Sequence, residues 1–328
     1  MAAALPLPPL HDVELYDTTL RDGSQGEGVN FSLADKLALT QALDWFGAAC
    51  IEGGWPGSNP KDEAYFAAVR EAPPRRAKLC AFGSTRHAKF APEDDPNLRK
   101  LVAAQADAIT IFGKSWTLHV TDALRVPLDQ NLEMIRSSVA FLAASTGKPV
   151  LFDAEHFFDG FRADRGYALS ALEAAFTGGA CRLVLCDTNG GSLPAFVTEA
   201  VAAVRARLPQ AVLGIHVHND GGLAVANSLA AVEAGCVHVQ GTINGVGERC
   251  GNANMCSVIA GLALKLKQPV VRPDQLARLT EISHFVSEVA NLTPWPQQPY
   301  VGSSAFAHKA GYHTDGVIKV ESAYQHID

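Results

Sequence analysis

The sequence predicts a (β/α)8 TIM barrel, and three observations lead to that prediction. Eight short apolar runs rich in Val, Ile and Leu recur along the chain, as expected for strands buried on both faces. Amphipathic stretches of helical length separate these runs. Acids, imidazoles and amides follow the runs, and the catalytic groups of this fold lie at the carboxyl ends of its strands. The predicted strands span residues 13–16, 49–52, 78–82, 108–112, 150–153, 182–186, 212–217 and 237–242.

The predicted helices have recognisable ends. The first begins after an N-cap at Ser32 and ends at Gly47, and a later one begins at Asp129 and ends at Gly147. A last amphipathic helix covers 273–291. A doubly wound open sheet is the competing architecture, but it needs no eighth strand and usually has a GxGxxG turn, which RDGSQGEG lacks.

We expect two parts in the chain, a catalytic barrel over residues 1–292 and a linker and tail over 293–328. Three prolines fall within the segment TPWPQQPY, which predicts a stiff, extended linker. The tail that follows is polar and carries His313 and Tyr324, and we expect no further domain after it.

Composition limits the class of function. The 328 residues are 48% hydrophobic and 19% charged, and the net charge is −7. An acidic chain is not expected to bind nucleic acid or an anionic membrane surface as its main partner. No stretch of about 18 uninterrupted apolar residues is present, so no membrane span is expected. The seven cysteines form no CxxC pair, and the start lacks a signal-peptide pattern, so we expect free thiols in a cytoplasmic protein.

The segment IHVHND is the sharpest polar element. His216 and His218 are two residues apart on a predicted strand, so both side chains point to one face, as a shared metal ion requires. The pair alone fits equally well a core histidine beside a loop-capping histidine. Acidic residues follow neighbouring predicted strands, and they favour a metal site over this alternative. Mixed histidine and carboxylate ligands with open positions suit Mg²⁺, Mn²⁺ or Zn²⁺ rather than a closed structural zinc site.

Two further segments follow the first and eighth predicted strands. DTTLRDG brings Asp17, Arg21 and Asp22 to the strand end, either as solvated loop charges or as parts of a shared site. GVGERCGNAN contains three glycines that either form tight turns or receive an anion at the start of a helix. Asn252 in this second segment is a candidate metal ligand through its side-chain oxygen.

Together these segments resemble a known family. DTTLRDGSQ, IHVHND and NGVGERCGNAN are similar, in this order, to motifs of the acyl-CoA-condensing metal-dependent barrels: the 2-isopropylmalate, homocitrate and citramalate synthases. IEGGWPGSNPKDEAYF, FGKSWTLHV and DAEHFFDGF look most like the citramalate synthase branch. That branch condenses acetyl-CoA with pyruvate, so the resemblance implies a Claisen-type acyltransferase that uses a divalent metal to polarise the keto acid.

The resemblance implies roles for residues around the keto acid. Asp22 matches the family's metal ligand in LRDG, while Asp17 is expected to order the strand end and loop. Arg21 would lie beside the keto acid and the developing enolate. Thr188 matches the threonine that donates a hydrogen bond to the keto-acid carboxylate. Asp153 is a candidate for substrate binding, and with Phe82 and Phe112 we expect it to set the pocket size.

The resemblance also implies the proton-transfer groups. Glu155 matches the glutamate near the thioester. HKAGYHTDG resembles the segment with the family's catalytic histidine, here His313, and Tyr324 resembles the tyrosine that works with it. His308 is the nearby alternative. Family members act as homodimers in which the tail often serves the neighbouring subunit, and we expect the same here.

One departure and three alternatives accompany this reading. Members of the family usually continue into a C-terminal regulatory domain, whereas this chain ends at Asp328. The first alternative is condensation with another 2-keto acid. The second is a metal-dependent carbon–carbon lyase or aldolase of the same barrel group, which would share Asp22, His216 and His218. The third is a non-catalytic metal-binding scaffold.

Overall fold

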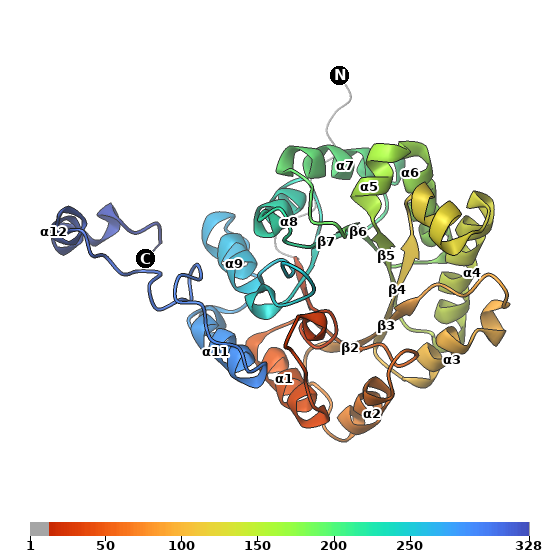
Figure 1. Cartoon of the computed structure of the whole chain (residues 1–328), viewed down its shortest axis with the longest axis horizontal. Helices are drawn as coiled ribbons and strands as arrows, with labels where there is room; N and C mark the ends of the chain where they lie inside the picture. The colour runs from red at the N-terminus through yellow and green to blue at the C-terminus, as the bar shows by residue number, and fades with distance from the viewer. Residues whose placement is uncertain (1–12, 328) are drawn as a thin grey trace.

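The predicted barrel is confirmed. The computed structural model describes residues 13–327. Its eight parallel strands close in the order β1 to β8, and Figure 1 shows helices surrounding them. The strands are β1 (Glu14–Asp17), β2 (Cys50–Gly54), β3 (Lys78–Ser84), β4 (Ala108–Lys114), β5 (Val150–Glu155), β6 (Arg182–Asp187), β7 (Leu213–Val217) and β8 (His238–Gly241). Every predicted strand overlaps one of these, with ends that differ by at most two residues.

The helices agree with the prediction in part. Helix α1 begins after the N-cap Ser32, whose side chain accepts a hydrogen bond from Asp35 N, and it ends at Gly47 in the left-handed conformation with φ 110°. The α-helices are α1 (Leu33–Phe46), α2 (Pro60–Ala68), α3 (Pro96–Ala103), α4 (Leu128–Thr146), α5 (Phe157–Ala163), α6 (Arg165–Gly178), α7 (Pro194–Arg207), α8 (Ala224–Glu233), α9 (Met255–Ala260), α10 (Pro273–Leu276), α11 (Leu279–Val289) and α12 (Gly311–Lys319).

Three predictions about the helices and linker were wrong in detail. Helix α4 begins at Leu128 behind an N-cap at Pro127, so Asp129 lies inside its first turn. The single helix expected over 273–291 is divided into α10 and α11. The segment 293–300 is folded into turns rather than extended, because backbone bonds such as Gln298 N to Trp295 O, 3.1 Å, close it on itself.

The barrel interior changes character along its axis. Towards the amino ends of the strands it contains small apolar side chains and thiols, including Cys50, Cys80, Ala108 and Leu151. Towards the carboxyl ends it becomes polar. There the Tyr16 hydroxyl lies 2.8 Å from Glu52 Oε1 and 2.7 Å from Thr110 Oγ1. Buried polar groups of this kind are stable only when they are hydrogen-bonded to one another.

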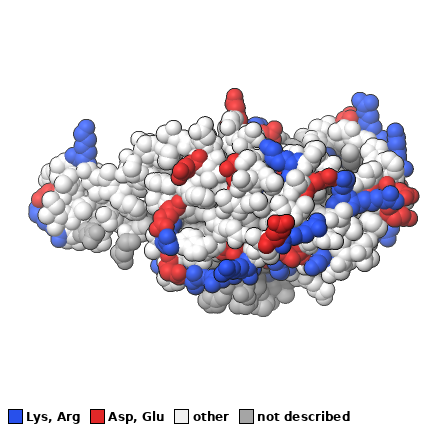
Figure 2. All heavy atoms as spheres, turned by 90° about the horizontal axis from the view of Figure 1, so that it is seen from below, with Lys and Arg blue, Asp and Glu red and all other residues white. Residues whose placement is uncertain are grey.

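The tail lies apart from the barrel. Figure 1 shows α12 beyond α9 and α11, at a distance from the strands. Large apolar side chains of this segment are exposed, among them Tyr312 at 89% and Ile318 at 79%. Figure 2 shows the projecting end of the molecule as mostly uncharged, whereas acidic and basic side chains intermingle over the rest of this face. Within residues 13–327, no helix combines the length and hydrophobicity needed to cross a lipid bilayer.

A buried ion pair connects α1 to α2, beside the loop after β2. The Lys36 ammonium donates to Gly53 O at 3.0 Å and to the Asp62 carboxylate, and both charged side chains are more than nine-tenths buried. Asp62 Oδ2 also accepts from Trp55 N at 2.8 Å. The pair therefore holds the loop that presents Trp55 to the barrel mouth.

We predict that Lys36→Met lowers the free energy of unfolding by about 3–5 kcal/mol, because it leaves the Asp62 charge buried and unpaired. Denaturant unfolding measures this loss. The double variant Lys36→Met/Asp62→Leu should recover part of it. Lys100→Met, which breaks a half-exposed surface pair with Glu63, is the control and should change stability by less than about 1 kcal/mol. A loss in Lys36→Met as small as in the control would contradict the prediction.

Candidate active site

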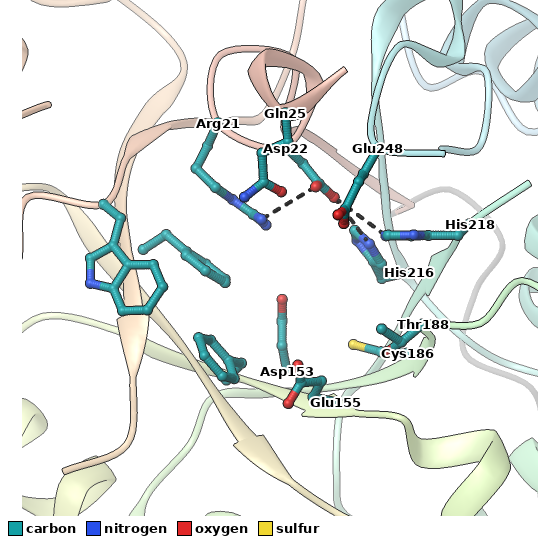
Figure 3. A pocket seen from close by; sticks show the side chains of 13 residues that line it. Arg21, Asp22, Gln25, Asp153, Glu155, Cys186, Thr188, His216, His218 and Glu248 are labelled. Carbon is teal, nitrogen blue, oxygen red and sulfur yellow. Dashed lines mark ion pairs between the residues drawn. The ribbon is translucent and has the colours of Figure 1, made fainter. Parts of the chain in front are cut away.

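A cavity of about 240 Å³ opens at the carboxyl ends of the strands, where the sequence placed the polar residues. Figure 3 shows Arg21 and Asp22 on one side of it, Asp153 and Glu155 opposite, and His216 and His218 beside Asp22. The lining residues are Arg21, Asp22, Gln25, Trp55, Phe82, Phe112, Asp153, Glu155, Cys186, Thr188, His216, His218 and Glu248.

Asp22, His216 and His218 form a candidate metal site. Each offers a ligand atom, and these atoms lie within 4.8 Å of one another. Asp22 Oδ2 is 3.3 Å from His216 Nε2 and 3.6 Å from His218 Nε2. The histidines lie at the end of β7 on one face, as their spacing predicted, and Asp22 lies in the turn after β1. All three side chains are buried.

The charges around Asp22 favour its ionised form. Burial by itself would raise the pKa of Asp22, but Arg21 and hydrogen bonds from His216 and His218 outweigh it and hold the pKa well below its usual value. Burial likewise acts to lower the pKa of His216, and Asp22 reverses this, so the pKa is raised. Asp22 is therefore a carboxylate near neutral pH, which is the form that binds a metal.

Asn252 fits a fourth ligand. Its Oδ1 is buried and has no hydrogen-bond partner among the described residues, although its Nδ2 donates to Val246 O at 3.3 Å. Asn252 also forms an isolated antiparallel bridge with His218, which brings its backbone beside the metal candidates. An unpaired buried carbonyl oxygen is costly unless something binds it. The four residues together present the nitrogen and oxygen donors that a catalytic divalent cation takes.

The glycines of GVGERCGNAN allow backbone conformations that other residues could not adopt. Of the two roles expected for them, this favours tight turns rather than the binding of an anion. Gly251 has φ 87°, and a Cβ at this position would lie 2.0 Å from Gly245 O. Asn252 N donates to the same oxygen at 3.0 Å. The close crossing of the chain at Gly245 and Gly251 thus fixes the backbone of Asn252.

Arg249 of the same loop reaches over the rim. Its Nη2 lies 2.7 Å from Thr188 O, 2.9 Å from Asp220 Oδ2 and 2.8 Å from His218 Nδ1. Nη2 has two hydrogens for these three neighbours. Here Nη2 donates to the lone pair of His218 Nδ1. When His218 Nε2 binds a metal, Nδ1 carries the proton, so the guanidinium has to move away from the ring and keep only the two oxygens as acceptors.

Arg21 is held rigidly over the cavity. Its Nε donates to Glu52 Oε2 at 2.6 Å, its Nη1 is 3.4 Å from Asp22 Oδ1, and its Cζ is 3.7 Å from the centroid of the Phe82 ring. Burial would lower the pKa of Arg21, but the charge of Glu52 raises it. The guanidinium is therefore a fixed cation whose remaining N–H groups are available to a substrate oxygen.

The opposite wall carries Glu155 and Thr188. The Glu155 carboxylate pairs with Lys114, the last residue of β4. Thr188 Oγ1 accepts a hydrogen bond from His156 N at 2.9 Å, so its own hydroxyl hydrogen is free to donate into the cavity. Burial raises the pKa of Asp153 to about 7, and its Oδ1 accepts from Gln240 Nε2 at 3.1 Å.

Three aromatic rings form the remaining wall. Phe82 and Phe112 stack with centroids 5.6 Å apart, and Trp55 meets both edge-on at 5.8 and 5.6 Å. Trp55 Nε1 donates to Asn97 Oδ1 at 2.7 Å, which fixes the indole. The wall is rigid and apolar beside the charged groups.

The structure brings most of the predicted site residues together, but not the tail. His313 and Tyr324 stack on each other with centroids 4.4 Å apart and planes at 26°. Neither lines the cavity, and α12 lies away from the strands. His308 lies 6.5 Å from His313 and 6.3 Å from Tyr324, ring centre to ring centre. Within one chain the tail therefore does not reach the site.

Asp17 is buried away from the cavity lining. Its Oδ1 accepts from Thr19 N at 2.9 Å and so shapes the turn after β1, the role expected for it. Burial raises the pKa of Asp17 to about 7, and the hydrogen bonds from Thr19 only partly oppose this.

Sequence reasoning missed several residues that serve the site. Glu52 anchors Arg21, Lys114 pairs with Glu155, and Trp55 forms part of the wall. Gln25 and Glu248 also line the cavity. The sequence did contain a signal for three of them. Glu52, Trp55 and Lys114 lie at or just after the carboxyl ends of strands, where site residues of this fold are expected. Their partners, however, depend on the register between strands.

The fold and the site define a (β/α)8 barrel with a candidate divalent-metal centre at the carboxyl ends of its strands. Residues 12–286 match the HMGL-like family model, and the chain belongs to that family. Solved structures agree in fold: the HMG-CoA lyase of Bacillus subtilis has a TM-score of 0.73 at 20% identity, covering 90% of this chain and 98% of that one.

The chain is also similar to curated relatives. It is 51% identical to the (R)-citramalate synthase of Geobacter sulfurreducens over 96% of this chain and 59% of the relative. It is 52% identical to the (R)-citramalate synthase of Aquifex aeolicus, over 96% and 60% respectively. The chain thus spans about three fifths of the length of these relatives.

We predict that the wild-type protein binds one Mn²⁺ per chain in equilibrium dialysis and that Asp22→Asn weakens this binding at least about 100-fold. Loss of a side chain that only hydrogen-bonds to a metal ligand costs about 10–100-fold in affinity, and Asp22 is a direct ligand candidate. Asp17→Asn is the matched control. It removes a buried aspartate of the same motif outside the cavity and should leave Mn²⁺ binding intact. Equal affinities of Asp22→Asn and wild type would exclude Asp22 as a ligand.

Proposed function

We propose that the chain condenses acetyl-CoA with pyruvate and water to give (R)-citramalate and CoA. The observation that carries the proposal is the arrangement of the cavity: Arg21 and the candidate metal ligands face Glu155 and Thr188 across a space of about 240 Å³. The names of the relatives at 51% and 52% identity support the choice of reaction.

The keto acid binds between the two walls. The Thr188 hydroxyl donates to its carboxylate, and the free N–H groups of Arg21 donate to oxygens that gain negative charge. Asp22, His216, His218 and Asn252 would hold a divalent cation, which supplies Lewis-acid polarisation of the ketone when bound.

The chemistry proceeds in two stages. A base removes a proton from the acetyl methyl group, and the electron pair of that C–H bond forms the new bond to the ketone carbon of pyruvate. The ketone oxygen then takes up a proton. Water cleaves the thioester, and the thiol of CoA leaves with a proton. Glu155, fixed by Lys114, would lie beside the thioester, and His313 with Tyr324 would move the methyl proton.

The aromatic wall favours a small keto acid. Phe82, Phe112 and Trp55 pack against one another, and Trp55 is held by Asn97, so they yield little to a bulkier side chain. A methyl group is the substituent that such a wall accepts with least displacement. We therefore propose pyruvate rather than a branched or longer 2-keto acid.

We further propose that the protein is a cytoplasmic homodimer in which the tail of one chain completes the site of the other. Tyr312 and Ile318 are exposed apolar side chains on α12, a helix that lies away from the strands of its own barrel. His313 and Tyr324 lie on this arm and outside the cavity of their own chain.

We predict that purified protein releases free thiol from acetyl-CoA with pyruvate and Mn²⁺ or Mg²⁺. Branched and dicarboxylic 2-keto acids should give kcat/KM values at least about tenfold lower, because the wall limits side-chain size. Thiol release is followed with a chromogenic disulfide reagent, and Asp22→Asn protein provides the background. A lyase or a non-catalytic protein would release no thiol above that background, and this outcome would overturn the proposal.

For the tail, we predict that His313→Ala and Arg21→Lys are each inactive alone but recover activity when mixed and allowed to exchange subunits. Statistical mixing leaves about a quarter of the sites with both an intact barrel and an intact tail in an isologous dimer. The measurement is thiol release after refolding or incubating the mixture. Native mass spectrometry of the same mixture, which separates heterodimers from homodimers by mass, is the control for exchange. Recovery absent from a mixture that does exchange would show that the tail does not act in trans.

A further inference from the structure

A column of buried polar side chains runs through the barrel beneath the candidate metal site. His216 Nδ1 is 3.0 Å from Gln240 Oε1, and Gln240 Nε2 is 3.4 Å from His238 Nε2. His238 Nδ1 is in turn 2.9 Å from Glu14 Oε2 at the amino end of β1. Gln240 and His238 are fully buried, each 0% exposed. The column therefore connects the metal candidates with the opposite end of the barrel.

The direction of each hydrogen bond follows from the carboxylate at its lower end. An ionised carboxylate only accepts, so His238 donates its Nδ1 hydrogen to Glu14. The pKa of Glu14 is lowered to about 2, chiefly by this bond, so the carboxylate is ionised. When the ring carries no second proton, its Nε2 has a lone pair, and this atom accepts from the Gln240 amide nitrogen.

The second amide hydrogen of Gln240 has its own acceptor. Gln240 Nε2 donates to Asp153 Oδ1 at 3.1 Å, so both amide hydrogens are directed away from His216. A flipped amide would set its oxygen against Asp153 Oδ1 and the His238 lone pair, and would present hydrogens to the Nδ1 hydrogen of His216. The described contacts allow one orientation, with Gln240 Oε1 towards His216 Nδ1.

We propose that Gln240 is a positioning residue that keeps the proton of His216 on Nδ1, and that Glu14 acts through His238 to set the orientation of Gln240. His216 Nε2 faces Asp22 Oδ2, 3.3 Å away, and donates to it in the structure described. A metal would take the place of that hydrogen on Nε2, while Gln240 holds the hydrogen on Nδ1. Tyr16 packs against the His238 ring at 5.1 Å and helps to hold it. The inference rests on the metal site of the proposed function.

The tautomer can be observed before any variant is made. In protein labelled with ¹⁵N-histidine, long-range ¹H–¹⁵N spectra distinguish the protonated from the unprotonated ring nitrogen. We expect His216 and His238 to carry a proton on Nδ1 in the metal-free protein, and His216 to keep it when Mg²⁺ binds. An unprotonated Nδ1 of His216 in the wild type would overturn the proposal, whatever the activity of the enzyme.

Variants then test the link to metal binding. Gln240→Met removes the acceptor with little change of shape, and Mn²⁺ affinity should fall about 10–100-fold, with His216 in mixed tautomers. Gln268→Met, which replaces a buried amide outside the cavity lining, is the control for general destabilisation and should bind Mn²⁺ normally.

Glu14→Leu tests the lower end of the column. With no carboxylate below it, His238 can carry its proton on Nε2, which permits the flipped amide, so we expect mixed His216 tautomers and an affinity loss of up to about tenfold. Unchanged tautomers in this variant would overturn the role of Glu14. Equal Mn²⁺ affinity in wild type and Gln240→Met would overturn the role of Gln240. A wild type that binds no Mn²⁺ would instead overturn the metal site of the proposed function, and the positioning role with it.

Discussion

The arrangement of the site depends on the buried carboxylate of Asp22, whose charge must be balanced by nearby cations. Asp22, Glu52 and Asp153 are 0–4% exposed, and Arg21 lies between the first two of them. One guanidinium cannot neutralise three buried carboxyl groups. Burial accordingly raises the pKa of Asp153 to about 7, so that group relieves part of the excess by binding a proton. A cation at Asp22, His216 and His218 would supply the missing positive charge, which explains why so polar a cluster is stable inside a barrel.

The sequence was sufficient for the barrel because each strand is a short apolar run between recognisable helices. It also predicted the metal candidates, since two histidines two residues apart on a strand must share a face. Residues whose role depends on a partner side chain were harder to predict from the sequence. Arg21 and Glu52 are 31 positions apart, and Lys114 and Glu155 are 41 apart, and these pairs form only when the strands adopt their register. The division between α10 and α11 and the position of the tail depend on packing that no local pattern encodes.

The side chains proposed to act in catalysis are held differently in the barrel and in the tail. The groups that must hold a keto acid and a cation project from strands whose neighbours fix them, as Arg21 is fixed by Glu52 and Phe82. His313 and Tyr324 are fixed mainly by each other, on a segment with exposed apolar side chains. A condensing enzyme must admit two substrates and then exclude water, and a proton-transfer group on a separate arm would allow the cavity to fill before it is completed.

The pairing of β1 with β8 joins the stability of the barrel to the chemistry of the site. This pairing closes the barrel, with Glu14 opposite His238 and Tyr16 opposite Gln240. The same four residues make up or support the column beneath His216. A shift of this register by one residue would reverse which side chains point inward, so the barrel could close only with the column lost. Correct closure and correct orientation of the metal candidates are therefore one structural event, and substitutions in β8 should affect both together.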